Sequence, residues 1–371
     1  MKNILLMGAG KIGEMISIML ADSGDYHVTV ADRDETALAR MPKHKAIETK
    51  VVDALDVVAM DAVMAGKYAV LMACGHVMTH VIAPAAKKAG AHYFDLTEDV
   101  ASTRLVKELA ADSETAFVPQ CGLAPGFIGI VAYHLAKGFD ELHNVHMRVG
   151  ALPRYPSNAL KYNLTWSTDG LINEYCQPCE AIIDGRKTET PPLEQLETIS
   201  VDGVEYEAFN TSGGLGTLTE TLDGKVRNLN YRTMRYPGHR DILKMLLQDL
   251  RLNERQDLMR EIFENALPIT TEDVIVIYAT VSGMKNGKFM EECFAHKVYA
   301  QEINGRMHTG IQITTAAGIC TMLDMLVNGD LPQKGFVRQE DADFNVFIAN
   351  RFGSAYAKDA AIESDISVAA E

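Results

Sequence analysis

Apolar runs of strand length alternate with stretches of helical hydrophobic spacing along the first part of the chain. The first run, residues 4–7, precedes a segment at 12–20 in which apolar residues recur every three or four positions. This alternation predicts a right-handed, doubly wound parallel sheet, an α/β fold. Further strand-like runs lie at 27–31, 46–53, 68–73, 90–99 and 117–120, and helical spacing returns at 35–41, 81–89 and 127–134.

The pattern changes near Asn144, where apolar and polar residues begin to alternate. We expect a mixed, largely antiparallel sheet here, with helices on one face. An apolar helix over 314–327 is expected to pack back on the first sheet, and the small, polar tail from about Asp359 is expected to fray. The strand candidates are 145–150, 162–166, 179–183, 204–209, 225–233, 273–281 and 294–302, and the helix candidates are 241–251 and 254–264.

With 371 residues, the chain is longer than one typical hydrophobic core supports. We therefore predict a dinucleotide-binding domain at 1–126 and an inserted α+β domain for substrate binding and dimerisation at 127–308. Residues 309–371 would return to the first domain. Dimerisation through the middle sheet, giving a homodimer, is a fold-level expectation.

Composition narrows the class of protein. Lys and Arg number 35 against 50 Asp and Glu, a net charge of −15, which argues against nucleic acid or an anionic membrane as a partner. No apolar run reaches the length of a membrane span, and only four apolar residues follow the first three, too few for a signal-peptide core. These features predict a cytoplasmic protein.

The six cysteines predict reduced thiols and no metal site. Cys176 and Cys179 have metal-ligand spacing, but no second pair lies at a zinc-ribbon distance. Reduced, structural cysteines are therefore the favoured interpretation.

A glycine motif, Gly-Ala-Gly-Lys-Ile-Gly, joins the first strand to the first helix. Gly8 permits the tight turn, Gly10 lets the backbone approach a pyrophosphate, and Gly13 lets helix and strand pack closely. Unpaired amides at the helix start would bind the phosphates, with Lys11 and Ile12 inside the site. Because the motif lies between a strand and an amphipathic helix, it favours a dinucleotide site over an ordinary turn.

The residue that ends the second strand bears on the choice of dinucleotide. The carboxylate of Asp32 can accept hydrogen bonds from ribose hydroxyls and would repel a 2′-phosphate. Arg33 could instead pair with that phosphate. NAD is favoured, and NADP stays open.

Later strand ends supply further candidate cofactor contacts. Asp53 follows the third strand and could face the adenine amino group, or could cap a loop. Ala73, Cys74 and Gly75 end the fourth strand and should border the ribose or nicotinamide, because ligands bind at the carboxyl ends of such strands. Gly122 begins an irregular turn at the far edge of the sheet and joins this predicted site.

Three further motifs carry a resemblance to a known family. They are Gly-Leu-Ala-Pro-Gly at 122–126, Trp-Ser-Thr-Asp-Gly at 166–170 followed by Glu174-Tyr175, and Met-Arg-Tyr-Pro-Gly-His at 234–239. With segments 8–13, 92–97 and 314–318, they occur in the right order over nearly the whole chain. The sequence resembles the saccharopine dehydrogenase-like (saccharopine reductase) family, and within it the lysine 6-dehydrogenases.

The resemblance implies a Rossmann domain, an inserted substrate domain and a nicotinamide-dependent reaction at an amine-bearing carbon. For lysine 6-dehydrogenases, that reaction is oxidative deamination of the lysine ε-amine to the semialdehyde. Two departures count against saccharopine itself as substrate: Ala124 stands where the family pattern has Asp, and the helix after the fourth strand has no lysine before Lys87. Saccharopine or carboxynorspermidine dehydrogenase is the alternative.

Arg235 is our first candidate for binding a substrate α-carboxylate, because the Tyr-Pro-Gly turn after it can hold a guanidinium rigidly. A structural ion pair is its other interpretation. His239 has a side chain suited to proton transfer, or could cap the helix that starts near Asp241. Tyr162 and Trp166 would share one face of a strand, where they could line an aliphatic chain or fill the core.

Thr97 and Glu98 follow a strand and could hold the substrate amine, or form a solvated loop. The sequence does not indicate which residue acts as the general base. A small amino-acid or polyamine-like molecule is the expected substrate. A hypothesis of another class is a non-catalytic NAD-sensing protein, which Ala124 motivates.

Overall fold

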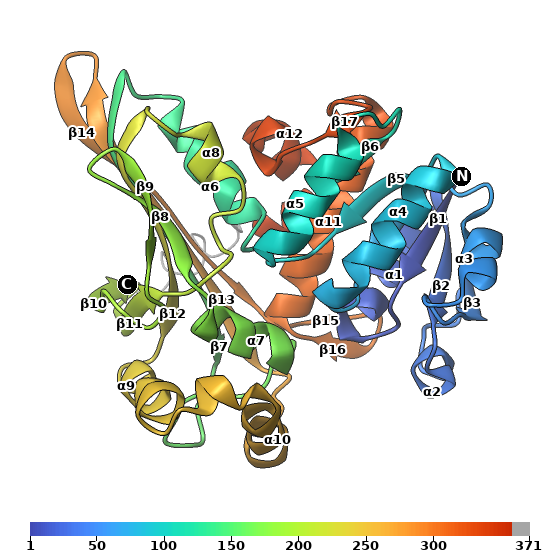
Figure 1. Ribbon diagram of the computed structural model, residues 1–371, viewed down its shortest axis with the longest axis horizontal. Helices are drawn as coiled ribbons and strands as arrows, with labels where there is room; N and C mark the ends of the chain where they lie inside the picture. The colour runs from blue at the N-terminus through green and yellow to red at the C-terminus, as the bar shows by residue number, and fades with distance from the viewer. Residues whose placement is uncertain (358–371) are drawn as a thin grey trace, which may run out of the picture.

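The computed structural model describes residues 1–357, which form two sheets packed on a shared set of helices (Figure 1). The first sheet has seven strands, all parallel, in the doubly wound order that the sequence predicted. In spatial order these are β17 (Gly335–Phe336), β6 (Ala116–Val118), β5 (His92–Asp95), β4 (Ala69–Met72), β1 (Lys2–Met7), β2 (Tyr26–Asp32) and β3 (Ile47–Val51).

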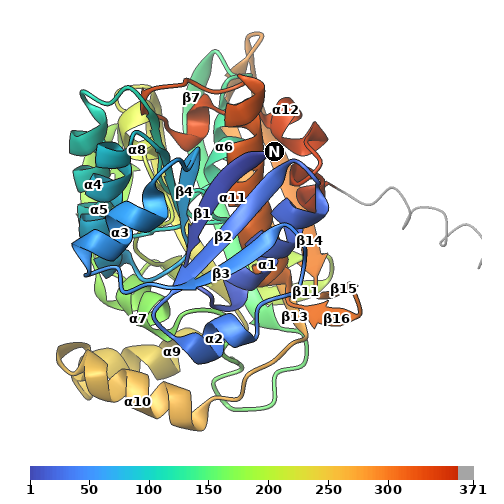
Figure 2. The same ribbon diagram turned by 90° about the vertical axis from the view of Figure 1, so that its right-hand side faces the viewer.

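Helices cover both faces of this sheet because successive residues of its strands point to opposite sides. On β1, Ile4 and Leu6 pack with α1 and α11, whereas Leu5 and Met7 pack with α3, α4 and α5. Figure 2 shows the two groups of helices on opposite sides of the strands. The helices are α1 (Lys11–Asp22), α2 (Glu35–Ala39), α3 (Val57–Met64), α4 (Thr79–Ala89), α5 (Val100–Ala110) and α11 (Gly310–Asn328).

The second sheet lies on the other side of α11 and is mixed, as predicted. Strands β7 and β12 are parallel neighbours, and the other pairs are antiparallel. The strands in order are β10 (Glu197–Val201), β11 (Val204–Asn210), β12 (Val226–Arg235), β7 (Glu141–Pro153), β13 (Asp273–Lys285) and β14 (Lys288–Tyr299), with β8 (Cys179–Ile183) and β9 (Arg186–Thr190) beside β12. The predicted fold class is confirmed.

Shorter elements complete the described part of the chain. A two-stranded ribbon pairs β15 (Gln301–Ile303) with β16 (Arg306–His308). The remaining α-helices are α6 (Phe127–Ala136), α7 (Thr168–Cys176), α8 (Leu218–Thr221), α9 (His239–Lys244), α10 (Gln256–Ala266) and α12 (Phe344–Ala349). Short 3₁₀ turns span His76–Met78, Leu252–Glu254, Gln339–Asp341 and Gly353–Tyr356.

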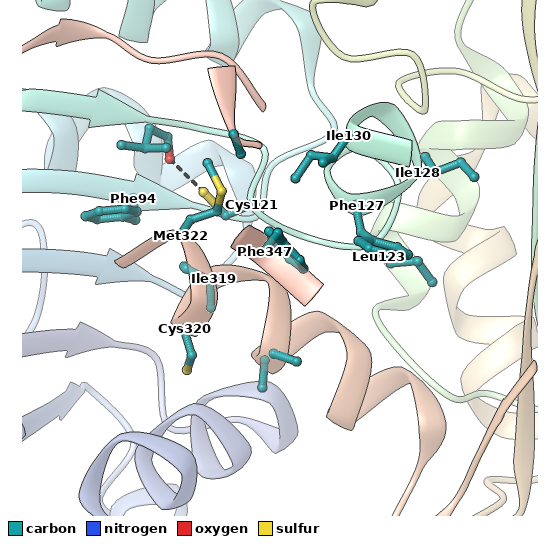
Figure 3. Packing of buried hydrophobic residues seen from close by; sticks show 14 of the residues in the cluster. Phe94, Cys121, Leu123, Phe127, Ile128, Ile130, Ile319, Cys320, Met322 and Phe347 are labelled. Carbon is teal, nitrogen blue, oxygen red and sulfur yellow. Dashed lines mark hydrogen bonds between the residues drawn. The ribbon is translucent and has the colours of Figure 1, made fainter. Parts of the chain in front are cut away.

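One hydrophobic core runs through both sheets. Buried residues of β1, α1, α6, α11, β7, β12 and β13 belong to the same cluster. Figure 3 shows Leu123, Phe127 and Phe347 together with the α11 residues Ile319 and Met322 in this core. Helix α11 is long and apolar enough for a membrane span by composition, but 83% of its apolar stretch is buried inside the protein.

Three local expectations differ from the structure. Residues 162–166 form no strand, and only Leu164 makes an isolated bridge, to Ile269. The physical reason is a side-chain contact: Asn158 bonds to both the amide and the carbonyl of Tyr162 and holds the chain in a turn.

The other two differences concern element bounds. The strand expected at 294–302 is the second half of a long hairpin, turned at Asn286 and Gly287, and it ends at Tyr299. The helix expected at 241–251 begins at His239 and continues as a π-helical turn, Met245–Asp249.

Some expectations reach beyond the described residues. Positions 358–371 of the predicted third domain, with the tail expected to fray, lie outside them. The domain boundaries and the homodimer through the second sheet stay predictions.

Packing of α11 against the backbone at Cys121 and Gly122 generates a prediction about stability. A Cβ added to Gly318 would lie 2.4 Å from the carbonyl oxygen of Cys121 and 3.0 Å from that of Gly122, so one backbone must shift. We expect Gly318→Ala to cost about 1–3 kcal/mol of unfolding free energy, the usual range for overpacking. The measurement is the urea unfolding midpoint.

The matched control is Gly129→Ala in α6. A Cβ at that helical glycine meets nothing within 4 Å, so the midpoint should rise with a gain of about 0.5–1 kcal/mol. Equal midpoints for the two variants would contradict the proposed close contact.

Candidate active site

The turn between β1 and α1 has a shape that only glycine allows at two positions. Gly8 has a φ of +114°, and a Cβ there would lie 2.7 Å from the carbonyl oxygen of Ala73. A Cβ on Gly13 would lie 2.0 Å from the carbonyl oxygen of Gly8. The turn therefore packs directly against the end of β4, which brings two predicted cofactor segments together.

The start of α1 fits a pyrophosphate. Gly10 is the N-cap, no side chain caps the helix, and a Cβ on Gly10 would meet nothing within 4 Å. Backbone amides at an uncapped helix start, in front of open space, suit a phosphate. Lys11 is exposed, and its carbonyl oxygen accepts a hydrogen bond from the Gln312 side chain, while Ile12 faces the central cavity.

Asp32 is fixed beside this turn by backbone hydrogen bonds. Its Oδ2 accepts from the amide of Ala9 at 2.8 Å, and its Oδ1 accepts from the amide of Asp34 at 3.0 Å. Arg33 is exposed. Asp53 is also exposed, and its carboxylate accepts from the amide of Leu55 at 3.0 Å, which is the loop-capping arrangement left open by the sequence.

A cavity of about 780 Å³ lies where the carboxyl ends of β4, β5 and β6 meet the second sheet and α7. Ten of the predicted site residues or their neighbours in the motifs line it. On the nucleotide side these are Ile12, Ala73, Cys74, Gly75, Thr97, Glu98, Gly122 and Ala124, and on the other side Trp166 and Arg235.

Arg235, at the end of β12, is 2% exposed and lines the cavity. Its Nε donates to the Tyr175 hydroxyl at 2.9 Å and its Nη1 to the Met234 carbonyl at 2.8 Å. No carboxylate among residues 1–357 forms an ion pair with it, unlike Arg232 on the same strand, which pairs with Glu197.

The surroundings of Arg235 keep it charged. Burial disfavours the charge, but Tyr175, Tyr162 and Glu174 together raise its pKa above the usual value. The guanidinium lies 5.2 Å from the Tyr162 ring centroid and 5.8 Å from that of Tyr175. Aromatic faces at these distances stabilise a cation.

His239 lies behind Arg235 and does not line the cavity. Its Nδ1 donates to the Leu160 carbonyl at 2.8 Å, so its Nε2 must accept, and does so from the Tyr175 hydroxyl at 3.1 Å. Burial, with the nearby Arg235 charge, lowers the pKa of His239 to about 3. The position gives a neutral imidazole with both nitrogens occupied, at the first residue of α9, which differs from the proton-transfer group that the sequence suggested.

The two aromatic candidates occupy different layers. Tyr162 is fully buried behind Arg235. Trp166 lines the cavity, and its Nε1 donates to the Tyr162 hydroxyl at 3.1 Å. The structure therefore places the indole, and not the phenol, at the cavity wall.

The segment after β5 brings Thr97 and Glu98 into the cavity. Thr97 is held by Asp95, whose Oδ1 accepts from the Thr97 amide at 3.1 Å. The Glu98 carboxylate makes no hydrogen bond or ion pair to another residue within 1–357. Burial raises its pKa, and the neighbouring His76 opposes that rise.

Glu174, on α7, and Tyr231, on β12, were not among the predicted site residues. Both line the cavity, with exposures of 7% and 6%. Burial raises the pKa of Glu174 to about 8, with Arg235 opposing and Glu98 adding to the rise. The available sequence signal was an acid between Leu171 and Tyr175 on the apolar side of a short helix, behind a serine cap at 167.

Comparisons with known proteins agree with this architecture. Residues 4–118 match the family description "Saccharopine dehydrogenase NADP binding domain", and residues 122–354 match "Saccharopine dehydrogenase C-terminal domain". The chain belongs to the saccharopine dehydrogenase family. It is a saccharopine dehydrogenase-like, NAD(P)-dependent oxidoreductase, so the predicted family and NAD(P) cofactor are confirmed.

A solved structure shows the same fold. Apo saccharopine dehydrogenase (L-Glu forming) from Saccharomyces cerevisiae superposes with a TM-score of 0.76 at 15% identity, over 94% of this chain and 96% of that one. C. glutamicum DAP dehydrogenase in complex with DAP gives 0.49 at 11% identity, over 96% and 99% of the chains. A putative myo-inositol dehydrogenase from Sinorhizobium meliloti gives 0.44 at 11%, over 88% and 89%.

The open space at Gly10 gives a prediction about cofactor binding. Gly10→Val should fold normally, because a Cβ there meets no protein atom and the φ of −76° suits any residue. The valine side chain would occupy the pyrophosphate position, so we expect NAD(P)H to lose about tenfold or more in affinity. Melting temperatures with and without NAD(P)H measure both effects.

Gly13→Val is the contrasting variant, because its Cβ would lie 2.0 Å from a backbone oxygen and should destabilise the apo protein itself. If NAD(P)H raised the melting temperature of Gly10→Val as much as that of the native protein, the pyrophosphate would lie elsewhere.

Proposed function

We propose that this protein oxidises the amine-bearing carbon of an amino acid with NAD(P), and that its substrate group is the ε-amine of lysine. The observation that carries the proposal is a single cavity with a buried, unpaired guanidinium and unpaired carboxylates beside the nicotinamide end of the nucleotide site. A substrate that has both a carboxylate and a distal amine complements such a cavity.

Arg235 would bind the substrate α-carboxylate. Two of its donors are used internally, by Tyr175 and Met234, which leaves the other N–H groups for a ligand. Charge-assisted hydrogen bonds from a preorganised guanidinium to a carboxylate are among the strongest in proteins. The tyrosines around Arg235 remove the entropy cost of orienting it.

Glu98 would bind the ε-amine. It follows β5 directly, next to Thr97 and the Ala73–Gly75 turn, where the nicotinamide of a doubly wound domain lies. Its unpaired carboxylate suits an ammonium group, and its raised pKa suits a group that takes a proton from that ammonium. Trp166 would cover the methylene chain between the two ends.

The bound cofactor supplies the redox step by accepting a hydride from the carbon that carries the amine. The chain's part is to orient that carbon and to remove the ammonium proton beforehand, because a protonated amine is a poor hydride donor. Water then adds to the resulting imine, and loss of ammonia leaves the semialdehyde.

A secondary-amine substrate, as in a saccharopine or carboxynorspermidine dehydrogenase, is the alternative reaction. Saccharopine carries additional carboxylates, and each one needs a cationic partner. Apart from Arg235, the described lining contains Arg260 as its one further arginine or lysine, and Arg260 already pairs with Asp169 at 3.1 Å. Ala124 adds no polar group. This distribution of charge favours lysine.

Assays with lysine, saccharopine and carboxynorspermidine at 340 nm, with both cofactors, test the reaction directly. We expect turnover with lysine, rising with pH as amine and carboxylic acid lose their protons. Activity with none of these amines would contradict the proposal and favour an NAD-sensing protein.

The role of Arg235 gives a second prediction. Arg235→Lys keeps a positive charge but loses the bond to Tyr175 and the forked geometry, so the KM for lysine should rise about tenfold to a hundredfold with a smaller change in kcat. Arg232→Lys, on the opposite face of β12, is the matched control and should leave KM unchanged, since its partner Glu197 lies outside the cavity. Steady-state kinetics in lysine decide between them.

Asp32 gives a third prediction, about cofactor choice. The carboxylate anchored to Ala9 would repel a 2′-phosphate, so the native protein should favour NAD over NADP. Asp32→Asn keeps a hydrogen-bond acceptor for Ala9 but removes the charge, and should narrow the preference by about tenfold. Dissociation constants of NADH and NADPH measure it, and a native preference for NADPH would refute it.

A further inference from the structure

We propose that Glu174 binds the α-ammonium group of the substrate and so makes the cavity selective for α-amino acids. This inference rests on the proposed function. Glu174 has no part in the cofactor binding by the glycine motif, in the carboxylate binding by Arg235 or in the ε-amine binding by Glu98, and this inference gives it a role.

The first argument is burial without a partner. Glu174 is 7% exposed, and it lines the cavity from α7. Its backbone carbonyl accepts from the Ser212 amide at 3.0 Å, which anchors the helix end. Within residues 1–357 its carboxylate makes no hydrogen bond or ion pair. A buried carboxylate without a partner is costly, so its retention in a cavity points to a ligand that supplies the partner.

The second argument is its position relative to the other charges. Arg235 and Glu174 both line the cavity and each shifts the pKa of the other, yet they form no ion pair among the ion pairs of residues 1–357. The α-carboxylate and α-ammonium of an amino acid are attached to one carbon. A guanidinium and a carboxylate that face the same space, held apart from each other, therefore suit that head group. Glu98 lines the same cavity beside His76 and also raises the pKa of Glu174, and it is left for the distal amine.

The third argument is charge complementarity. Lysine offers one carboxylate and two ammonium groups, and the cavity offers Arg235, Glu174 and Glu98. Each charged group of lysine then pairs with a group of opposite charge, and Arg235, Glu174 and Glu98 are all compensated. An ω-amino acid without the α-amino group would leave Glu174 unpaired.

The ionisation of Glu174 supports this arrangement. Its pKa of about 8, raised by burial and by Glu98 and opposed by Arg235, keeps it mostly protonated at pH 7 in the empty cavity. A bound ammonium favours the carboxylate, so lysine binding at pH 7 should release about one proton to solvent. The other titratable groups facing Glu174 are Tyr231 of β12, Tyr162 before α7, Cys179 of β8 and Tyr175 on its own helix.

The experiment compares two substrates in two proteins. Lysine and 6-aminohexanoate share the carboxylate and the ε-amine, and differ in the α-amino group. In the native protein kcat/KM should favour lysine by about 10- to 200-fold, the usual value of a satisfied charged contact. In Glu174→Gln the loss should fall mainly on lysine, so that the ratio collapses to within a few fold of one.

Calorimetry of lysine binding to the NADH-loaded native protein, in buffers of different ionisation enthalpy at pH 7, supplies a second readout. Proton release should accompany lysine but not 6-aminohexanoate. It needs no variant, so it tests the assignment even if Glu174→Gln folds poorly.

The outcomes separate the two claims. A native protein inactive with lysine overturns the proposed function. A native protein that turns over lysine, but in which Glu174→Gln lowers both substrates equally and binding releases no proton, overturns the role of Glu174 and leaves the proposed function standing.

Discussion

A one-directional chain of hydrogen bonds fixes the charge at the centre of the cavity. The Leu160 carbonyl can only accept, so His239 donates to it from Nδ1 and must accept at Nε2. Tyr175 then donates to His239 and accepts from Nε of Arg235. Each hydrogen bond in the chain fixes whether the next group donates or accepts, so the guanidinium is oriented before any ligand binds. A neutral histidine behind it keeps the positive charge on the cavity side.

Much of the fold follows from local sequence pattern. The first sheet can be predicted from the sequence because its buried strands are short apolar runs separated by amphipathic helices, and because glycines mark the phosphate turn. The second sheet is less readable where tertiary contacts override the pattern. Alternation at 162–166 suggests a strand, but the Asn158 side chain takes over its backbone hydrogen bonds. The helix α7 escapes prediction because only nine residues, two of them glycine or cysteine, carry its signal.

Some residues of the site could likewise be predicted from the sequence, and others could not. Residues whose role depends on backbone shape, such as Gly8 and Gly13, are identifiable from a motif because no other residue fits. Residues whose role depends on what surrounds them are not. From sequence, His239 is a candidate for proton transfer, but burial and two hydrogen bonds make it a neutral support. Glu174 belongs to a sequence motif without an assigned role, and only the packing of α7 brings it to the cavity. The sequence identifies the ionisable groups, but their pKa values depend on burial, which is set by the packing of segments that are distant in the sequence.

The core shared by the two sheets constrains how the protein can admit a substrate. Because α6 and α11 contribute side chains to one cluster with strands of both sheets, a hinge between the sheets would have to open that cluster to water. Residues of α7, α9 and α10 form a cap with a second cluster, which also includes Phe209 of β11. The exposed Arg260–Asp169 pair joins α10 to α7 within this cap, at the edge of the cavity. Hinge motion between the two large lobes would therefore disturb the buried interior, and the shared core holds the walls of the cavity at a fixed spacing.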